Sequence, residues 1–231
     1  MLIVVDNWKS GTGKTTISVH IAMQLLLNKK KVVILYWVNN SAVVQCMSNI
    51  VYSNLKFDLI MIPEHIQCAT AVSVFIKHYK KVYDYVIVDS VPEQFFEILY
   101  CLAHIIFTPI SDSLIDLYSI VNTINNYTPS QYSTKIWNVR VKRCKDSLPV
   151  LTWYIVLNRY SLGKSKNRDK IIMHLKNIVK KFGANYIEGM ADRVVYKSLF
   201  LGLDNIFSNK RRVITPALND IVKITNCILD F

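Results

Sequence analysis

Short, uninterrupted apolar runs recur along the chain of 231 residues, and longer stretches of mixed polarity separate them. A strand that is buried on both faces of a sheet has such a run, because neither face alternates with polar residues. The runs are LIVV at 2–5, VVILYWV at 32–38, FDLIMI at 57–62, YVIV at 85–88, HIIF at 104–107 and LTWYIVL at 151–157. They predict strands of a parallel sheet that other elements cover on both sides.

The stretches between the runs have the periodicity of amphipathic helices. Within residues 14–29, Ile17, Ile21 and Leu25 follow one another at intervals of four, which places them on one helix face. Similar patterns occupy residues 64–80, 112–125, 167–182 and 215–229. Strands that alternate with helices predict an α/β fold, with a doubly wound, mainly parallel sheet and helices on both faces.

A single domain is expected over residues 1–231, because a chain of this length can bury one full core. One segment departs from the alternation: residues 127–149 are polar, contain proline and serine, and then become basic. We expect an irregular basic insertion or a small hairpin there. No apolar run approaches the ~18 residues that a membrane-spanning helix needs, so membrane insertion is not expected.

Cysteine spacing and the first residues indicate a cytoplasmic protein. The five cysteines are widely spaced without a C-x-x-C pair, and the five histidines are scattered. Disulfides and a zinc site are therefore not expected, as in a reducing compartment. The N-terminal residues lack the basic region, apolar stretch and cleavage site of a signal peptide.

Residues 6–16 read DNWKSGTGKTT, directly after the first apolar run. The general phosphate-loop pattern G-x-x-x-x-G-K-[ST] has a glycine five positions before Gly13, where this chain has Trp8. The rest of the context fits such a loop, because an apolar strand and a tight turn precede a helix whose exposed N–H groups favour an anion. Gly11 and Gly13 let the backbone approach phosphate oxygens closely.

The stretch K-S-G-T-G-K-T-T resembles the deviant Walker A motif, K-G-G-x-G-K-[ST]-[ST], of the ParA/MinD superfamily of ATPases. That family also lacks the early glycine, and it has a signature lysine at the position of Lys9. YDYVIVDSVP at 83–92 looks like the family's Walker B segment, and 31–35 looks like its second strand. VLNR at 156–159 is similar to the strand end where family members place an adenine-contacting asparagine. The resemblance implies the fold of a P-loop NTPase over most of the chain.

The resemblance implies ATP and Mg²⁺ as cofactors. Lys14 would bind the β- and γ-phosphates. Thr15 would hold Mg²⁺ directly, and Asp89 would hold it through a bound water. The chemistry of these three side chains supports the same roles independently. Lys9 would reach the nucleotide of a second subunit, so that an ATP-dependent homodimer forms, and Lys9 and Lys14 would be the catalytic residues. The implied nucleotide-binding residues are Lys9, Ser10, Gly11, Thr12, Gly13, Lys14, Thr15, Thr16 and Asn158.

Two departures from the family pattern bear on activity. Ser10 replaces a glycine, which is tolerable where the backbone does not need positive φ. After the second strand the family reads D-x-D-P-Q, whereas residues 36–40 here read YWVNN, with Val38 in place of the aspartate that positions the attacking water. Phosphoryl transfer depends mostly on positioning and charge stabilisation. We therefore expect ATP binding with slow or absent hydrolysis.

Positive charge is concentrated in one part of the chain. The net charge is +12, and residues 135–212 contain 18 lysines and arginines against 5 acidic residues. Such segregation indicates a polyanionic partner, with the nucleic-acid backbone as the leading candidate. ParA-type dimers bind double-stranded DNA without sequence preference when loaded with ATP, so the resemblance points the same way. The DNA-binding residues expected from it are Arg193, Lys197, Lys210, Arg211 and Arg212.

Three functions compete on these grounds. A ParA-like protein that partitions plasmid, chromosome or viral DNA would be nucleoid-associated, and a ParB-like or other regulatory protein would reset it. A MinD-like regulator at a membrane surface is less favoured, because the final residues PALNDIVKITNCILDF contain one lysine and two aspartates. A packaging or translocating motor would need efficient hydrolysis and a trans-acting arginine, for which Arg159 or Arg193 could serve. We expect the ParA-like function.

Overall fold

A computed structural model describes residues 1–37, 57–163, 166–193, 196 and 215–231. Two sets of expectations lie outside these residues. The first concerns the residues after the second strand, Val38, Asn39 and Asn40. The second concerns four of the expected DNA-binding residues, Lys197, Lys210, Arg211 and Arg212.

Seven strands form the central sheet, and six of them match the apolar runs of the sequence. They are β1 (Leu2–Val5), β2 (Val32–Trp37), β3 (Asp58–Ile62), β4 (Tyr85–Asp89), β5 (Ile105–Ile110), β8 (Thr152–Leu157) and β9 (Asn185–Glu188). Their order across the sheet is β3-β2-β4-β1-β5-β8-β9, and all neighbouring strands are parallel. Because β1 is central and the chain extends the sheet in both directions from it, the predicted doubly wound parallel sheet is confirmed.

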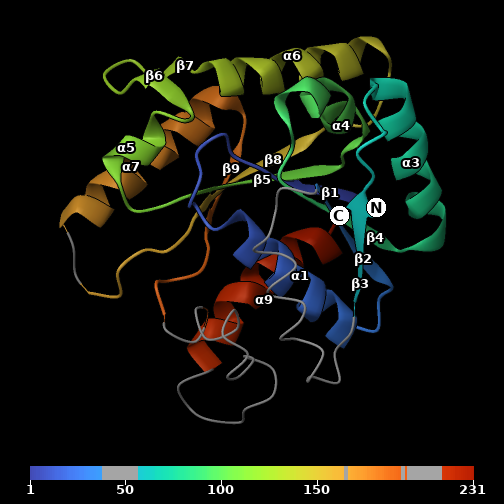
Figure 1. The fold of residues 1–231 in the computed structure, drawn as a ribbon. Coiled ribbons are helices and arrows are strands. Elements are labelled where there is room, and N and C mark those ends of the chain that lie inside the picture. The colour runs from blue at the N-terminus through green and yellow to red at the C-terminus, as the bar shows by residue number, and fades with distance from the viewer. Residues whose placement is uncertain (38–56, 164–165, 194–195, 197–214) are drawn as a thin grey trace.

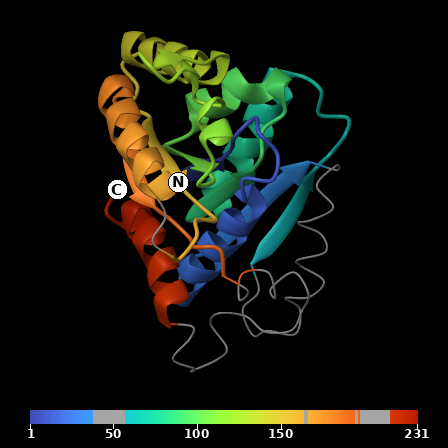
Figure 2. The same ribbon diagram turned by 90° about the vertical axis from the view of Figure 1, so that its left-hand side faces the viewer.

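Helices cover both faces of this sheet, with α1 and α9 on one face and α3, α4, α6 and α7 on the other (Figure 1). The helices are α1 (Lys14–Leu27), α3 (Ala69–Val82), α4 (Phe96–Leu102), α5 (Leu114–Leu117), α6 (Gln131–Lys145), α7 (Lys166–Phe182) and α9 (Thr215–Leu229), and a 3-10 turn, η1 (Glu93–Phe95), precedes α4. Figure 2 shows α6 and α9 on opposite sides of the molecule. No helix among the described residues is long and apolar enough to cross a membrane.

Burial on both faces explains why the strands are solid apolar runs. Leu2 and Val4 belong to the core beneath α3, α4, α6 and α7, whereas Ile3 and Val5 belong to the core beneath α1 and α9. All four side chains are completely buried. Successive strand residues point to opposite faces, so a strand between two helical layers has no position at which a polar side chain would reach solvent.

The expectation of an irregular segment at 127–149 is wrong for most of its length. Residues 131–145 form the regular helix α6, whose N-terminus is capped by Ser130 accepting from the N–H of Ser133. Tyr132, Ile136 and Val139 are buried at helical spacing. The many polar and basic residues of α6 cover its solvent side, which made an amphipathic helix look like a polar insertion.

The helix expected over 112–125 is also shorter in the structure. α5 ends at Leu117, and the chain then forms two short antiparallel strands, β6 (Val121–Thr123) and β7 (Thr128–Pro129). The small hairpin expected for the irregular segment therefore lies just before α6. β7 ends at Pro129. Proline cannot donate a backbone hydrogen bond, but it is tolerated in a strand that lies at the edge of a sheet.

Candidate nucleotide-binding site

The loop of residues 6–13 leaves the carboxyl end of β1 and leads into α1, at the edge of the sheet where ligands bind in open α/β folds. Gly11 and Gly13 have φ of +74° and +92°, which side chains other than glycine rarely adopt. A Cβ atom added to Gly13 would lie 2.2 Å from Nδ2 of Asn158. The backbone at Gly13 is thus packed directly against the end of β8, and glycine is required there on two grounds.

The amino end of α1 is arranged to receive an anion. Gly13 is its N-cap, no side chain caps the helix, and its first turn contains no acidic residue. The first N–H groups of a helix have no partner within the helix, and together with the helix dipole they bind phosphate groups.

Lys14 already bonds to the loop that precedes it. Its Nζ donates to the carbonyl oxygens of Asn7 and Lys9, both at 3.0 Å. Burial lowers the pKa of Lys14, while Asp6 and Asp89 act to raise it. Asn7 is itself fixed, because its Nδ2 donates to the carbonyl of Pro109 at 2.8 Å. The ammonium group is therefore held over the loop by neutral carbonyl oxygens, which a phosphate would outcompete.

Thr15 and Asp89 meet at the position expected for a magnesium site. The Thr15 hydroxyl donates to one carboxylate oxygen of Asp89 at 2.7 Å, and the Ser18 hydroxyl donates to the other at 2.9 Å. Asp89 is the last residue of β4 and is almost completely buried. A hydroxyl and a carboxylate are oxygen ligands of the kind that Mg²⁺ prefers, and Mg²⁺ usually keeps several waters and substrate phosphates as well.

Lys9 forms an ion pair within the same chain, with Asp116 of α5. Asp116 also accepts from the backbone N–H and the hydroxyl of Ser111, at 2.9 and 2.6 Å. Burial acts to raise the pKa of Asp116, but these bonds from Lys9 and Ser111 leave it below its ordinary value. The signature lysine of the sequence motif is thus bound to a local carboxylate rather than extended into solvent.

A cavity of about 240 Å³ lies on the other side of the loop, between the ends of β8 and β9. Asn158 lines it, donates from Nδ2 to the carbonyl of Thr12 at 2.9 Å, and has a buried Oδ1 without a partner. Arg159 donates to the carbonyl of Gly11 at 2.8 Å and lines the same cavity. An orphaned amide oxygen in a cavity beside a phosphate loop fits the exocyclic amino group of a purine base, because a buried acceptor needs a donor.

Arg193, expected from the sequence to contact DNA, also lines this cavity. Its guanidinium is mostly buried and forms an ion pair with Asp220 of α9 at 3.4 Å. The structure therefore places Arg193 beside the candidate base site.

A buried carboxyl group, Asp6, connects the loop with the elements around it. Its oxygens accept from the hydroxyl of Tyr100 at 2.9 Å and from the N–H of Val91 at 3.2 Å. Tyr132 donates to the carbonyl oxygen of Asp6 at 3.0 Å and contacts Tyr100 through its hydroxyl. Burial raises the pKa of Asp6 to about 6, although the Tyr100 bond and the charge of Lys14 act to lower it. The network joins β1, the segment after β4, and helices α4 and α6.

Trp8 extends from the loop towards the same helices. Its ring packs edge-on against Phe96 and Tyr132, with centroids 6.0 and 5.7 Å apart. The ammonium of Lys135 lies 4.7 Å from the Trp8 ring centroid, a cation–π geometry, and also pairs with Glu93 at 2.7 Å. The indole that replaces the early glycine of the general pattern is therefore a packing contact between loop and helices.

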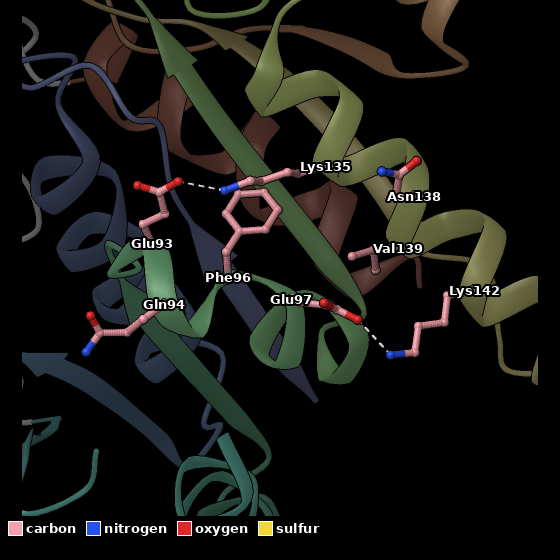
Figure 3. A pocket seen from close by; sticks show the side chains of 8 residues that line it. All are labelled: Glu93, Gln94, Phe96, Glu97, Lys135, Asn138, Val139 and Lys142. Carbon is pink, nitrogen blue, oxygen red and sulfur yellow. Dashed lines mark hydrogen bonds and ion pairs between the residues drawn. The ribbon is translucent and has the colours of Figure 1, made fainter. Parts of the chain in front are cut away.

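A groove of about 430 Å³ runs between α4 and α6 and begins at these residues (Figure 3). Phe96 and Val139 contribute its apolar surface. Two ion pairs cross it, Lys135 with Glu93 and Lys142 with Glu97, each at 2.7 Å. All four charged side chains remain at least partly exposed, so the pairs contribute little to stability.

The structure brings together the sequence-predicted residues from Lys9 to Thr16 with Asp89 and Asn158, although they come from three separate strand ends. Sequence reasoning missed Asp6, Asn7, Ser18 and Asp116. Ser18 follows Lys14 by one helical turn and could have been found from that spacing. Asp116 had no local signal, because its partner is Lys9, more than a hundred residues earlier.

Within the described residues, no group of three or more histidine, cysteine, aspartate or glutamate side chains could hold a metal ion. A site built from Thr15, Asp89, waters and phosphate oxygens does not need such a group. The glycine cradle, the uncapped helix, the lysine and the orphaned Asn158 oxygen together fit a magnesium nucleotide.

Comparisons with known proteins agree with this geometry. The family model of the ATPase MipZ matches residues 1–223. No curated protein matches the sequence.

Solved structures share the fold at low identity. A variant of McdA from Cyanothece in complex with ATP is 15% identical, with a TM-score of 0.65, covering 100% of this chain and 96% of that one. A plasmid partition protein from Borrelia burgdorferi B31 bound to AMPPNP is 14% identical, with a TM-score of 0.62 and 98% of both chains covered. The septum site-determining protein MinD from Pyrococcus horikoshii OT3, complexed with Mg-ADP, is 13% identical, with a TM-score of 0.61, covering 98% and 95%. The chain belongs to the MipZ family of ATPases, within the ParA/MinD superfamily.

Proposed function

We propose that this protein is a ParA-like partition ATPase, which binds Mg-ATP, dimerises around it and then binds double-stranded DNA without sequence preference. The observation that carries the proposal is the convergence of Lys14, the Thr15–Asp89 pair and the orphaned Asn158 oxygen around one glycine loop. Each would meet a different part of one ligand: phosphate, metal and base.

The ion pair of Lys9 with Asp116 supports a nucleotide-controlled dimer. If Lys9 serves the nucleotide of a second subunit, it must first leave Asp116. Asp116 is held by Ser111 in any case, so it would remain hydrogen-bonded after Lys9 moves. The pair therefore favours the monomer, and ATP together with a second subunit would have to outcompete it.

Asp116→Asn tests this role. The substitution weakens the hold on Lys9, so we expect dimerisation at a lower ATP concentration, measured by analytical ultracentrifugation. Asp112→Asn is a matched control, because Asp112 lies in the same segment but accepts from the backbone N–H of Ser161. Equal dimerisation of both variants and the wild type would exclude a role for the pair.

The DNA part of the proposal is supported by the concentration of positive charge in residues 135–212. It is tested by binding to random-sequence duplex DNA in Mg-ATP, in Mg-ADP and without nucleotide, with phosphate release followed in the same samples. Salt-sensitive binding only in Mg-ATP, with slow phosphate release, is the expected result. Equal DNA binding in Mg-ATP, in Mg-ADP and without nucleotide would show that the basic surface acts independently of the nucleotide loop. That result would overturn an ATP-gated function.

Slow hydrolysis remains part of the proposal because the family aspartates after the second strand are replaced in YWVNN. A nucleoid-associated location and a ParB-like or other regulatory partner would accompany a partition function. A single-turnover rate equal to that of an active ParA protein would contradict the slow-hydrolysis part alone.

A MinD-like positioning function is the second candidate, since MinD shares the fold. Helix α9 weighs against it as the membrane-binding element. Its apolar residues Ala217, Ile221, Ile224 and Ile228 are buried against the sheet and α1. An interfacial helix needs that face for lipid, so α9 could bind a membrane only by leaving the core.

A further inference from the structure

Helix α7 has a strongly cationic exposed face. Its buried side, with Ile171, Leu175 and Ile178, packs into the core. The lysines on its exposed side are Lys166, Lys170, Lys176, Lys180 and Lys181. Asp169 is the one acidic residue within the helix. We call these five lysines the α7 lysine face.

Among the described residues of the basic region, the other cationic side chains, with the exception of Lys145, are engaged by the protein itself. They form ion pairs or donate to backbone carbonyls: Lys135 with Glu93, Lys142 with Glu97, Arg168 with Glu188, Arg193 with Asp220, Arg159 with the Gly11 carbonyl, and Arg140 and Arg143 with several carbonyls each. These groups are held by structural contacts and contribute less to an open binding surface.

The α7 lysines differ, because only Lys181 has a partner, the carbonyl of Asn126 at 2.6 Å. Lys166, Lys170, Lys176 and Lys180 have none among the residues that the structure describes, and they share this state with Lys145 alone in the described part of 135–212. Among the described residues of the basic region, the lysines without a partner are therefore gathered on α7, apart from Lys145 on α6.

The spacing of these lysines suits a nucleic-acid backbone. At about 100° and 1.5 Å per residue, Lys166, Lys170, Lys176 and Lys180 lie within an arc of about 120° and span about 21 Å along the helix. A DNA strand presents about six phosphates over that length of duplex. Several ammonium groups can therefore meet one strand at the same time.

An exposed tryptophan adds a second, independent feature beside this face. Trp137 of α6 is 57% exposed and lines a cavity of about 260 Å³ between α6 and α7, together with Arg140, Lys181 and Phe182. A single exposed aromatic ring is common on protein surfaces, so Trp137 gains meaning only from its place beside the lysines of α7. On single-stranded nucleic acid such a ring would stack on bases, whereas against duplex DNA it can add only contact area next to the lysines.

We propose that the α7 lysine face, with Trp137 at its border, is the surface that contacts the DNA backbone. This inference rests on the proposed DNA-binding function and assigns that function to a surface. It differs from the surface expected around residues 193–212, of which the described member, Arg193, is paired with Asp220 beside the base cavity.

The test compares two double variants. Lys176→Gln/Lys180→Gln removes two exposed lysines four residues apart on α7, and Lys77→Gln/Lys81→Gln removes two exposed lysines four residues apart on α3. Binding to random-sequence duplex DNA is measured by fluorescence anisotropy over a salt series in Mg-ATP. Each lost phosphate contact lowers the slope of log K against log salt by about 0.9, so the α7 variant should lose about 1.8 in slope and about tenfold in affinity at ~0.15 M salt. The α3 variant should match the wild type.

A third variant, Trp137→Ala, should weaken binding without changing the salt slope, because it removes contact area but no charge. Circular dichroism melts establish that all variants are folded. If the α7 double variant binds DNA as tightly as the wild type does, the assignment of DNA binding to α7 is overturned, and the proposed function is unaffected. No wild-type binding to DNA in any nucleotide state would overturn the proposed function itself. Binding through α7 to phosphatidylserine vesicles but not to DNA would replace DNA with a membrane surface.

Discussion

In the phosphate loop both lysines are held by atoms of the protein, whereas on α7 four lysines have no partner among the described residues. Lys14 is bonded to two loop carbonyls and Lys9 to Asp116. Both regions are cationic, and both are candidate sites for a phosphate-bearing ligand. In the phosphate loop the protein fixes the positions of the cationic groups before a ligand binds, whereas the α7 lysines are free to adjust to the ligand.

This difference teaches what each region can recognise. Partly buried, hydrogen-bonded lysines such as Lys9 and Lys14 interact more strongly at short range and select one ligand geometry. Exposed lysines on flexible stems are screened by salt and accept phosphates at many positions. A specific nucleotide site and a sequence-independent DNA surface need these two opposite arrangements.

The largest effect should follow from removing the held lysine. Lys14→Gln loses a charged donor to phosphate, and hydrogen bonds to charged groups contribute about 1.5–3 kcal/mol each. Affinity for Mg-ATP should fall about 100-fold, measured by isothermal titration calorimetry. The Lys176→Gln/Lys180→Gln variant should bind Mg-ATP as the wild type does. An equal loss in both would show that the two cationic regions do not act separately.

An effect of similar size, on stability rather than on affinity, is expected when the loop backbone is disturbed. Gly13→Ala adds a Cβ atom 2.2 Å from Asn158 Nδ2 at a residue with φ of +92°. It should lower the free energy of unfolding by about 2–3 kcal/mol, because the left-handed backbone is strained and the Asn158–Thr12 bond is displaced. Gly11→Ala is the matched control, since its φ is +74° and its added Cβ meets nothing within 4 Å. It should cost about 1–2 kcal/mol in urea unfolding.

Asp6 makes stability depend on pH. Burial raises its pKa from 3.8 to about 6, so the folded state keeps the proton more strongly than the unfolded state does. This contribution is fully present below pH 4 and is lost as the pH rises through 6. Between pH 4 and pH 8, this effect should lower the free energy of unfolding of the wild type by about 2 kcal/mol. Asp6→Asn has no carboxyl group at this position, so its free energy of unfolding should lack this decrease. If urea titrations of both proteins gave the same dependence of stability on pH, the raised pKa of the buried Asp6 carboxyl group would be contradicted.

The smallest effect should come from the exposed charges of the α4–α6 groove. Glu97→Gln breaks the ion pair with Lys142, whose partners are both more than half exposed. Exposed pairs contribute little because water and salt screen them. The melting temperature should stay within experimental error of the wild-type value. A large drop would show that the ion pairs of the groove stabilise the protein as much as the contacts of the phosphate loop do.

Local chemistry made the sheet and the loop predictable. The stretch from LIVV to GTGKTT contains a doubly buried strand, the glycines of a tight turn and the start of a helix, all within residues 2–16. Such features depend on neighbours in sequence, so apolar pattern and glycine placement are enough. Helix α6 was predictable in principle from the spacing of Tyr132, Ile136 and Val139, but its polar solvent face concealed it.

By itself, the sequence determined six of the seven strands of the sheet, the phosphate loop and the concentration of basic residues after position 135. Only the tertiary structure decided which of those charges are used internally. Lys9 meets Asp116, Arg193 meets Asp220, and Asp6 meets Tyr100, across separations that no local pattern encodes. A charged side chain is free or engaged according to what the fold brings within hydrogen-bond distance, and that depends on packing between distant segments.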